Sequence, residues 1–459
     1  MRKILFFILI IINFSNANDI TQNMINKDFK PLVYKILDNR YFTINTYEEA
    51  NEHKPLTGKD LDNIHHMLLK YQDTKNKLEY FINKYKNLAT TNNNNYKKSE
   101  KLTLVMISLA ADLIRYDNYL LSYKNFVESN RLRRLANKED IGYNLKANIL
   151  DDITKNYNSK KNRDDLDAMI KFYKEHIKNN SNNSESFLYL KNIIENSIIY
   201  NDRINNIDLA KSNINYASKK TFDTGNKTRH LILNQTSKGF GNSVGVVETR
   251  KGKLYNKEDV ILNIKNNIKP GDILLEKTPF RLTDKFIPGY WGHAAIYIGT
   301  KEELIELGIW NNPIVKKYHK EIEEGKVIAE ALRDDVQLNS IKHFLNIDDL
   351  AILHNDYEPY KEKKERLILT LRQIGKKYDF EFDVETSDKI FCSELVYTTY
   401  FFVKWKTKNN AGTYTTSPDD IAYESIKDTT FFDITLLYHD GKEIKYNKKE
   451  FMKQLLEEE

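Results

Sequence analysis

The spacing of apolar residues changes near residue 225, and this change limits what the chain can fold into. From about residue 26 to residue 222, apolar side chains recur at helical spacing, and the segment 101–135 is the longest and most apolar run. Short polar breaks separate the runs, which favours antiparallel neighbouring helices. The first half of the chain is therefore expected to form a bundle-like, all-helical domain.

Beyond residue 225 the apolar segments are short, rich in Val, Ile and Ala, and bounded by Gly, Asp and Asn. Such segments are typical of strands in a mostly antiparallel sheet. Two longer amphipathic segments follow, one over 362–378 and one that begins near Phe391, so the second half is predicted to be α+β. The expected strands are RHLILNQ (229–235), SVGVVETRKG (243–252), GDILLEK (271–277), HAAIYIG (293–299), KVIAEALR (326–333) and DDLAILH (348–354).

The N-terminus carries the pattern of a cleaved secretory signal. Arg2 and Lys3 precede an apolar run from Ile4 to Ile12, and small and polar residues follow up to Ala17. This run is shorter than the roughly 20 residues that a membrane span needs. We therefore expect the mature protein to be exported, either periplasmic or secreted, with no transmembrane span. An uncleaved N-terminal anchor is the alternative.

These observations divide the chain into a signal peptide at 1–17, a helical domain of unknown role at 18–222 and a second domain at 223–459. Removal of the signal lowers the formal net charge from +6 to +4. Charges of both signs are interspersed along the rest of the chain. A nucleic-acid partner is not expected, because such a partner selects clustered Lys and Arg.

Cys392 is the sole cysteine of the chain, which excludes an intrachain disulfide, so the fold must be held by packing. In an exported protein a lone cysteine indicates intermolecular pairing or a reactive thiol. The alternative is a small buried apolar side chain, a common role for free cysteine. Cys392 lies where a polar segment gives way to a helix, for which Ser387 and Asp388 are the candidate caps, so Cys392 is expected in the first turn. A thiolate in the first turn of a helix is stabilised by backbone N–H groups.

A reactive thiol needs a base, and the base needs a group that orients it. His293 opens an expected strand, and the small side chains of Ala294 and Ala295 leave room for a helix to approach. Glu330 lies within another apolar strand, where a buried carboxylate requires a partner. Taken singly, His293 is better explained as a structural histidine at a strand start, and Glu330 is explained equally well as an outward-facing edge residue.

The motifs PGDILL, GHAAIYIG, VIAEAL, GKKYDFEFD, FCSELVY and SPDDIA occur in this order over roughly 265–425. In sequence and order they resemble the permuted papain-like cysteine amidase and peptidase family of YiiX/YaeF type, within the NlpC-like superfamily. The resemblance implies a circularly permuted papain-like domain without a cofactor. It implies Cys392 as nucleophile, His293 as general base and Glu330 as the residue that orients His293. It also places Tyr378 near the nucleophile, lining the substrate pocket or assisting the oxyanion.

The charged segment 308–325, between the His293 and Glu330 strands, is longer than the resemblance leads us to expect, and it leaves Glu306 as a rival third residue. The pair His65–His66 is not expected to bind a metal, because adjacent helical residues point to different sides and no acidic or His partner follows at i+4. No metal site is predicted.

The sequence thus predicts an exported cysteine hydrolase that cleaves an amide or ester bond through a Cys392 acyl-enzyme. The expected substrate is a peptide, an N-acyl amide or a lipid-like ester, and the sequence does not choose among them. One alternative is a binding protein that uses the helical domain to engage a protein partner. Another is a lipid acyltransferase on the same scaffold.

Overall fold

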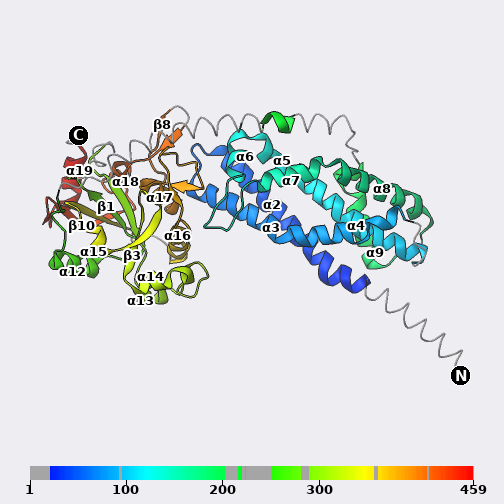
Figure 1. The fold of residues 1–459 in the computed structure, drawn as a ribbon, viewed down its shortest axis with the longest axis horizontal. Coiled ribbons are helices and arrows are strands. Elements are labelled where there is room, and N and C mark those ends of the chain that lie inside the picture. The colour runs from blue at the N-terminus through cyan, green and yellow to red at the C-terminus, as the bar shows by residue number, and fades with distance from the viewer. Residues whose placement is uncertain are drawn as a thin grey trace, which may run out of the picture. The chain divides into compact units, whose positions relative to one another are not determined.

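A computed structural model describes residues 21–91, 96–180, 182–201, 215–219, 223, 250–280, 289–355, 360–410 and 413–457 (Figure 1). The predicted signal peptide, the predicted strand 229–235 and most of the predicted strand 243–252 lie outside these residues. The chain divides into two units. Unit 1 comprises Met1–Asn51, Asn63–Asn137 and Asn148–Asp223, and unit 2 comprises Glu52–Asp62, Lys138–Ala147 and Thr224–Glu459.

The described part of unit 1 is built from helices, as the apolar spacing predicted. They are α2 (Lys30–Glu52), α3 (Gly58–Tyr85), α4 (Lys98–Asn118), α5 (Lys124–Glu128), α6 (Asn130–Ala136), α7 (Ile149–Asn158), α8 (Lys160–His176), α9 (Glu185–Glu195) and α10 (Ile198–Asn201), with short 3-10 or π turns at Ile25–Phe29, Lys86–Ala89, Tyr119–Tyr123 and Ile177–Asn179.

Helix α4 forms the centre of unit 1. Its residues from Leu104 to Ile114 are all buried, and it packs against α8 and α9. The predicted run 101–135 is not one helix, because a π turn follows α4 and the chain leaves helical geometry at Ser129. The Ser129 hydroxyl accepts a hydrogen bond from the backbone N–H of Leu132 and so caps α6. Among the described residues, no helix combines the length and hydropathy that a membrane crossing requires.

Unit 2 contains an antiparallel sheet, so the predicted α+β class with an N-terminal helical region is confirmed. Smaller pairs are β6 (Lys377–Tyr378) with β7 (Lys389–Ile390), and β8 (Lys408–Asn410) with β9 (Thr413–Thr415). The strands of the main sheet run, in spatial order, β11 (Lys442–Glu443), β10 (Asp433–His439), β5 (Asp349–His354), β1 (Ile273–Lys277), β2 (His293–Tyr297), β3 (Lys326–Ala331) and β4 (Val336–Ser340).

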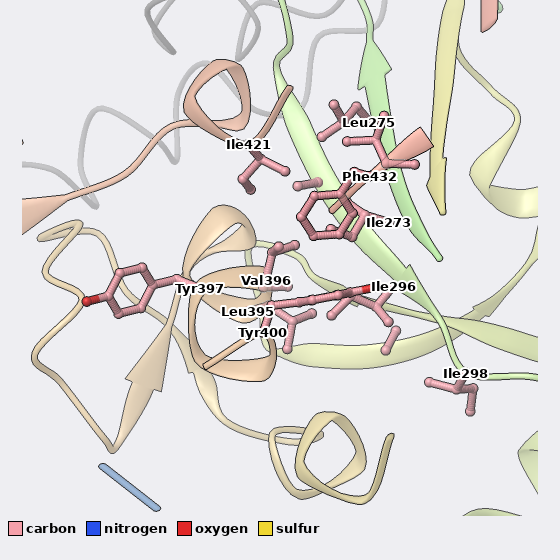
Figure 2. Packing of buried hydrophobic residues seen from close by; sticks show 14 of the residues in the cluster. Ile273, Leu275, Ile296, Ile298, Leu395, Val396, Tyr397, Tyr400, Ile421 and Phe432 are labelled. Atoms are coloured by element: carbon pink, nitrogen blue, oxygen red, sulfur yellow. The ribbon is translucent and has the colours of Figure 1, made fainter. Parts of the chain in front are cut away.

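Both faces of this sheet are covered, because alternate residues of the central strands enter different cores. Leu274 and Ile352 pack with residues of α12 (Glu258–Asn267) and α15 (Ile341–Phe344). Ile273 and Ile296 pack on the other face with the remaining C-terminal helices (Figure 2). These helices are α16 (Tyr360–Arg372), α17 (Cys392–Thr399), α18 (Pro418–Glu424) and α19 (Lys448–Glu457).

Two short segments from the first half of the chain, Glu52–Asp62 and Lys138–Ala147, belong to unit 2. The hydroxyl of Tyr397, in α17, donates a hydrogen bond to the carbonyl of Leu56 over 2.7 Å. The ammonium of Lys376 donates to the carboxylate of Asp140 over 2.7 Å, and both side chains are buried. Residues that lie far away in the sequence therefore hold α17, through Leu56, and the segment after α16, through Asp140.

Candidate active site

Cys392 is the first residue of α17 and is buried, with 3% of its surface exposed. The helix is capped neither by Ser387 nor by Asp388, which the sequence suggested as caps. Its N-cap is Phe391, whose backbone N–H donates to the carboxylate of Glu394 over 3.1 Å. Cys392 thus occupies the first helical position, where backbone N–H groups lack partners within the helix and can face the thiol.

His293 and Glu330 lie on neighbouring strands. Strands β2 and β3 pair antiparallel with Ala295 opposite Glu330, so His293, two residues earlier, shares the face of Glu330. His293 Nε2 lies 3.2 Å from Glu330 Oε2. Helix α17 packs against β2, and His293 and Cys392 shift each other's pKa, so the imidazole lies close to the thiol. The structure thus brings together the three residues that the sequence grouped.

Glu330 has further partners, which the sequence did not single out. Asn339 Nδ2, on β4, donates to Glu330 Oε1 over 2.7 Å, and His343 Nδ1, on α15, lies 3.8 Å from the same oxygen. One carboxylate oxygen therefore faces His293 and the other is held by Asn339. The alternation of VQLNS places Asn339 on the Glu330 face, but this pattern becomes informative only once β4 is known to pair with β3.

The electrostatics of the site favour a thiolate and an imidazolium. Burial raises the pKa of the Cys392 thiol, but hydrogen bonding and charge from His293 and backbone N–H groups of Ala294 and Ser393 outweigh it, and the net pKa is lowered. Burial lowers the pKa of His293, but its bonds to Cys392 and Glu330 raise it well above its usual value. Burial likewise opposes ionisation of Glu330, yet its partners, chiefly His293, lower its pKa to about 2.

Tyr378, at the end of β6, lies beside the strand that leads into Cys392. Its Cα is paired with that of Ile390, two residues before Cys392. Burial, and then the negative charge of Cys392, raises the pKa of Tyr378 well above its ordinary value. The hydroxyl therefore stays protonated and can donate a hydrogen bond at the sulfur.

Glu306 does not take the place of Glu330. It ends the short helix α13 (Lys301–Glu306) and is exposed, whereas Glu330 is 3% exposed and touches His293. The longer segment 308–325 forms a 3-10 turn and helix α14 (His319–Glu323), and its apolar residues Val315 and Ile322 join the core.

Asp419, in the SPDD segment at the start of α18, holds the chain just before His293. Its carboxylate accepts the backbone N–H of Tyr290 over 2.8 Å and that of Trp291 over 2.7 Å. Gly289 has a φ of +106°, and a Cβ there would lie 2.3 Å from the Asp419 carboxylate. Only glycine lets the loop approach so closely. The resemblance covered this motif, but the contact that it makes was not predicted.

The assembled side chains suit nucleophilic attack on a carbonyl. A buried thiol lies at a helix N-terminus, a histidine lies beside it, and a carboxylate fixes that histidine. Within the described ranges, no group of three or more His, Cys, Asp or Glu side chains is placed to hold a metal ion.

Comparison with known proteins addresses the C-terminal part of the chain. Neither the curated proteins nor the solved structures gave a match. The family model of the permuted papain-like amidase enzymes, YaeF/YiiX, C92 family, matches residues 267–445, which confirms the resemblance predicted from the motifs. The C-terminal part of the chain is thus similar to the permuted papain-like amidases of this family.

Proposed function

We propose that unit 2 is a cysteine hydrolase that cleaves an amide or ester bond through an acyl-enzyme on Cys392. The observation that carries this proposal is the continuous chain of contacts from Cys392 to His293 and from His293 to Glu330 at the start of α17. The family match supports an amidase-like activity for the same residues.

Acylation begins when the Cys392 sulfur attacks the carbonyl carbon and the carbonyl oxygen becomes an oxyanion. The backbone N–H of Cys392 is in the first turn of α17, where it can donate to that oxygen. Protonated His293 then transfers its proton to the leaving nitrogen or oxygen, the scissile bond breaks, and a thioester remains. Tyr378, which stays protonated beside the sulfur, is a second donor for the developing charge.

Deacylation repeats these steps with water as the nucleophile. Neutral His293 takes a proton from the water as its oxygen attacks the thioester carbon. Collapse of the second intermediate releases the carboxylic acid and restores the thiolate and imidazolium. Glu330 holds Nε2 of the ring throughout, so the other ring nitrogen remains directed at the reacting atoms.

Two alternative functions were also derived from the sequence. In an acyltransferase, a lipid or amine instead of water would resolve the same thioester. In a binding protein, unit 1 would engage a protein partner and unit 2 would serve as a scaffold.

We also propose that the protein is exported after loss of residues 1–17, on the strength of the N-terminal signal pattern. N-terminal sequencing of the mature protein tests this proposal.

The activity is tested with 4-nitrophenyl acetate and an N-acyl 4-nitroanilide. We expect a burst of chromophore and an acyl group on the Cys392 peptide by mass spectrometry, both lost in Cys392→Ser. An added alcohol or amine that captures the acyl group in preference to water would identify an acyltransferase. A folded protein that forms no acyl-enzyme with either reagent would contradict catalysis.

A further inference from the structure

Phe382, ten residues before the nucleophile, has a backbone conformation unusual for its type. Its φ is +54°. The other non-glycine residues with positive φ among the described residues are all Asn or Asp: Asn144, Asn148, Asn256, Asp440 and Asn447. A bulky side chain in this region is strained, and such strain gathers at functional sites where the surrounding structure enforces it.

The loop around Phe382 is tied down on both sides. Asp379 is fully buried, and its carboxylate accepts the backbone N–H groups of Glu381 and Asp383, each over 3.0 Å. Val384 is buried in the core, and its N–H donates to the carbonyl of Tyr414 over 2.9 Å. Phe382 lies between these anchors, yet 39% of its surface is exposed. The fixed backbone therefore presents an aromatic ring outward.

The ring of Phe382 lies next to residues that adjoin the thiol. Its centroid is 5.4 Å from that of Phe391, the residue directly before Cys392, and 6.3 Å from that of Tyr378, whose strand partner Ile390 lies two residues before Cys392. The rings of Phe391 and Tyr378 meet it edge to face, at 67° and 85°. An exposed phenylalanine needs no explanation by itself. The combination of a strained backbone, an anchored loop and a position close to the nucleophile does require an explanation.

We propose that Phe382 forms the apolar wall of a substrate subsite, and that the preferred substrate carries an aliphatic or aromatic group next to the carbonyl that Cys392 attacks. This inference rests on the proposed function and narrows its substrate class. It favours N-acyl amides, lipid esters and peptides with an apolar residue at the cleaved bond over substrates that are polar there.

The test compares two alkylating reagents, iodoacetamide and N-benzyliodoacetamide, on the single thiol. The ratio of their rate constants measures recognition of the benzyl group and does not depend on turnover. We expect the native protein to favour the benzyl reagent by about tenfold relative to free cysteine, the scale of one well-placed aromatic contact. Phe382→Asn should abolish this preference, since Asn tolerates positive φ but lacks the ring. Phe382→Trp should retain it.

Phe431→Asn is the matched control, because it removes a similarly exposed ring, 52% exposed, from a different loop. Its reagent ratio should equal that of the native protein. An unchanged ratio in folded Phe382→Asn would overturn the subsite while leaving the proposed hydrolase intact. If the ratio falls as expected but no ester or anilide acylates Cys392, the subsite stands and the proposed hydrolysis fails.

Discussion

His293 Nε2 lies 3.2 Å from Glu330 Oε2, across the pairing of β2 with β3, and the second oxygen of Glu330 is held by Asn339. A buried carboxylate with its own support is a rigid acceptor for a ring N–H. It therefore determines which nitrogen of His293 carries the proton and which faces the thiol.

Glu330→Gln should lower kcat strongly, by up to about 10⁴-fold, with little change in KM, because the amide disturbs the tautomer and orientation of His293 but not substrate binding. Glu306→Gln is the matched control and should behave like the native protein, since Glu306 is exposed on α13. Steady-state kinetics on an ester substrate check both variants. A crippled Glu306→Gln enzyme with an active Glu330→Gln enzyme would show that the wrong carboxylate has been assigned.

Alkylation of Cys392 should remain fast well below pH 8.5, the ordinary pKa of a free thiol. The reason is that the pKa of Cys392 is lowered and that of His293 is raised, and both shifts favour the thiolate–imidazolium pair. As pH falls below the thiol pKa, the reactive thiolate is lost and the rate drops.

His293→Ala removes the positive charge that stabilises the thiolate, while burial still raises the thiol pKa. The rate profile should therefore move to higher pH. The measurement is the iodoacetamide rate constant from pH 4 to pH 10, with no background from other thiols because Cys392 is the sole cysteine. A folded protein that alkylates slowly at every pH, with no response to His293→Ala, would leave Cys392 as a structural residue.

Asp140→Asn should destabilise unit 2, because it leaves the ammonium of Lys376 buried without its carboxylate. Removing one partner of a buried ion pair costs about 3–5 kcal/mol. All three tryptophans, Trp291, Trp310 and Trp405, belong to unit 2, so denaturant unfolding followed by tryptophan fluorescence reports on this unit. Asp334→Asn, at an exposed position, should not shift the transition. Equal midpoints for the two variants would show that Lys138–Ala147 contributes little to unit 2.

The sequence could predict the elements whose information is local. Short segments rich in Val, Ile and Ala indicated β1, β2, β3 and β5, and the motif order grouped Cys392, His293 and Glu330, which the structure brings together. Their chemical roles remain a prediction. The contribution of Leu56 and Asp140 to unit 2 could not be predicted, because nothing in the local sequence shows what a loop more than two hundred residues away will contact.

The same limit applies to the supports of the site. In the sequence, nothing distinguishes Asn339 and Asp419 from other polar residues. Only strand pairing places Asn339 against Glu330, and only helix packing places Asp419 against the loop before His293. Phe382 was unremarked for a different reason: a positive φ at phenylalanine opposes local preference and is imposed by its anchored neighbours. The cap of α17 was misassigned because Lys389 and Ile390 form β7, so the helix begins only at Cys392 and its N-cap is Phe391.

Asp419→Ala should lower the activity that depends on His293, because Asp419 holds the loop just before that residue. The Asp419 carboxylate accepts the backbone N–H groups of Tyr290 and Trp291, and Gly292 N–H donates to the Glu276 carbonyl over 2.9 Å, so the three residues before His293 are all fixed. Loss of the carboxylate leaves two donors unpaired and lets the loop move. A shift of about 1 Å in a catalytic group can cost about a hundredfold in rate.

We therefore expect kcat to fall by about a hundredfold in Asp419→Ala. The pH profile of Cys392 alkylation should move to higher pH, because His293 is no longer held beside the sulfur. Asp428→Asn, at an exposed position after α18, is the control and should change neither. A role confined to folding would lower the unfolding midpoint without moving the alkylation profile of the folded protein. That result would remove Asp419 from the residues that position the base.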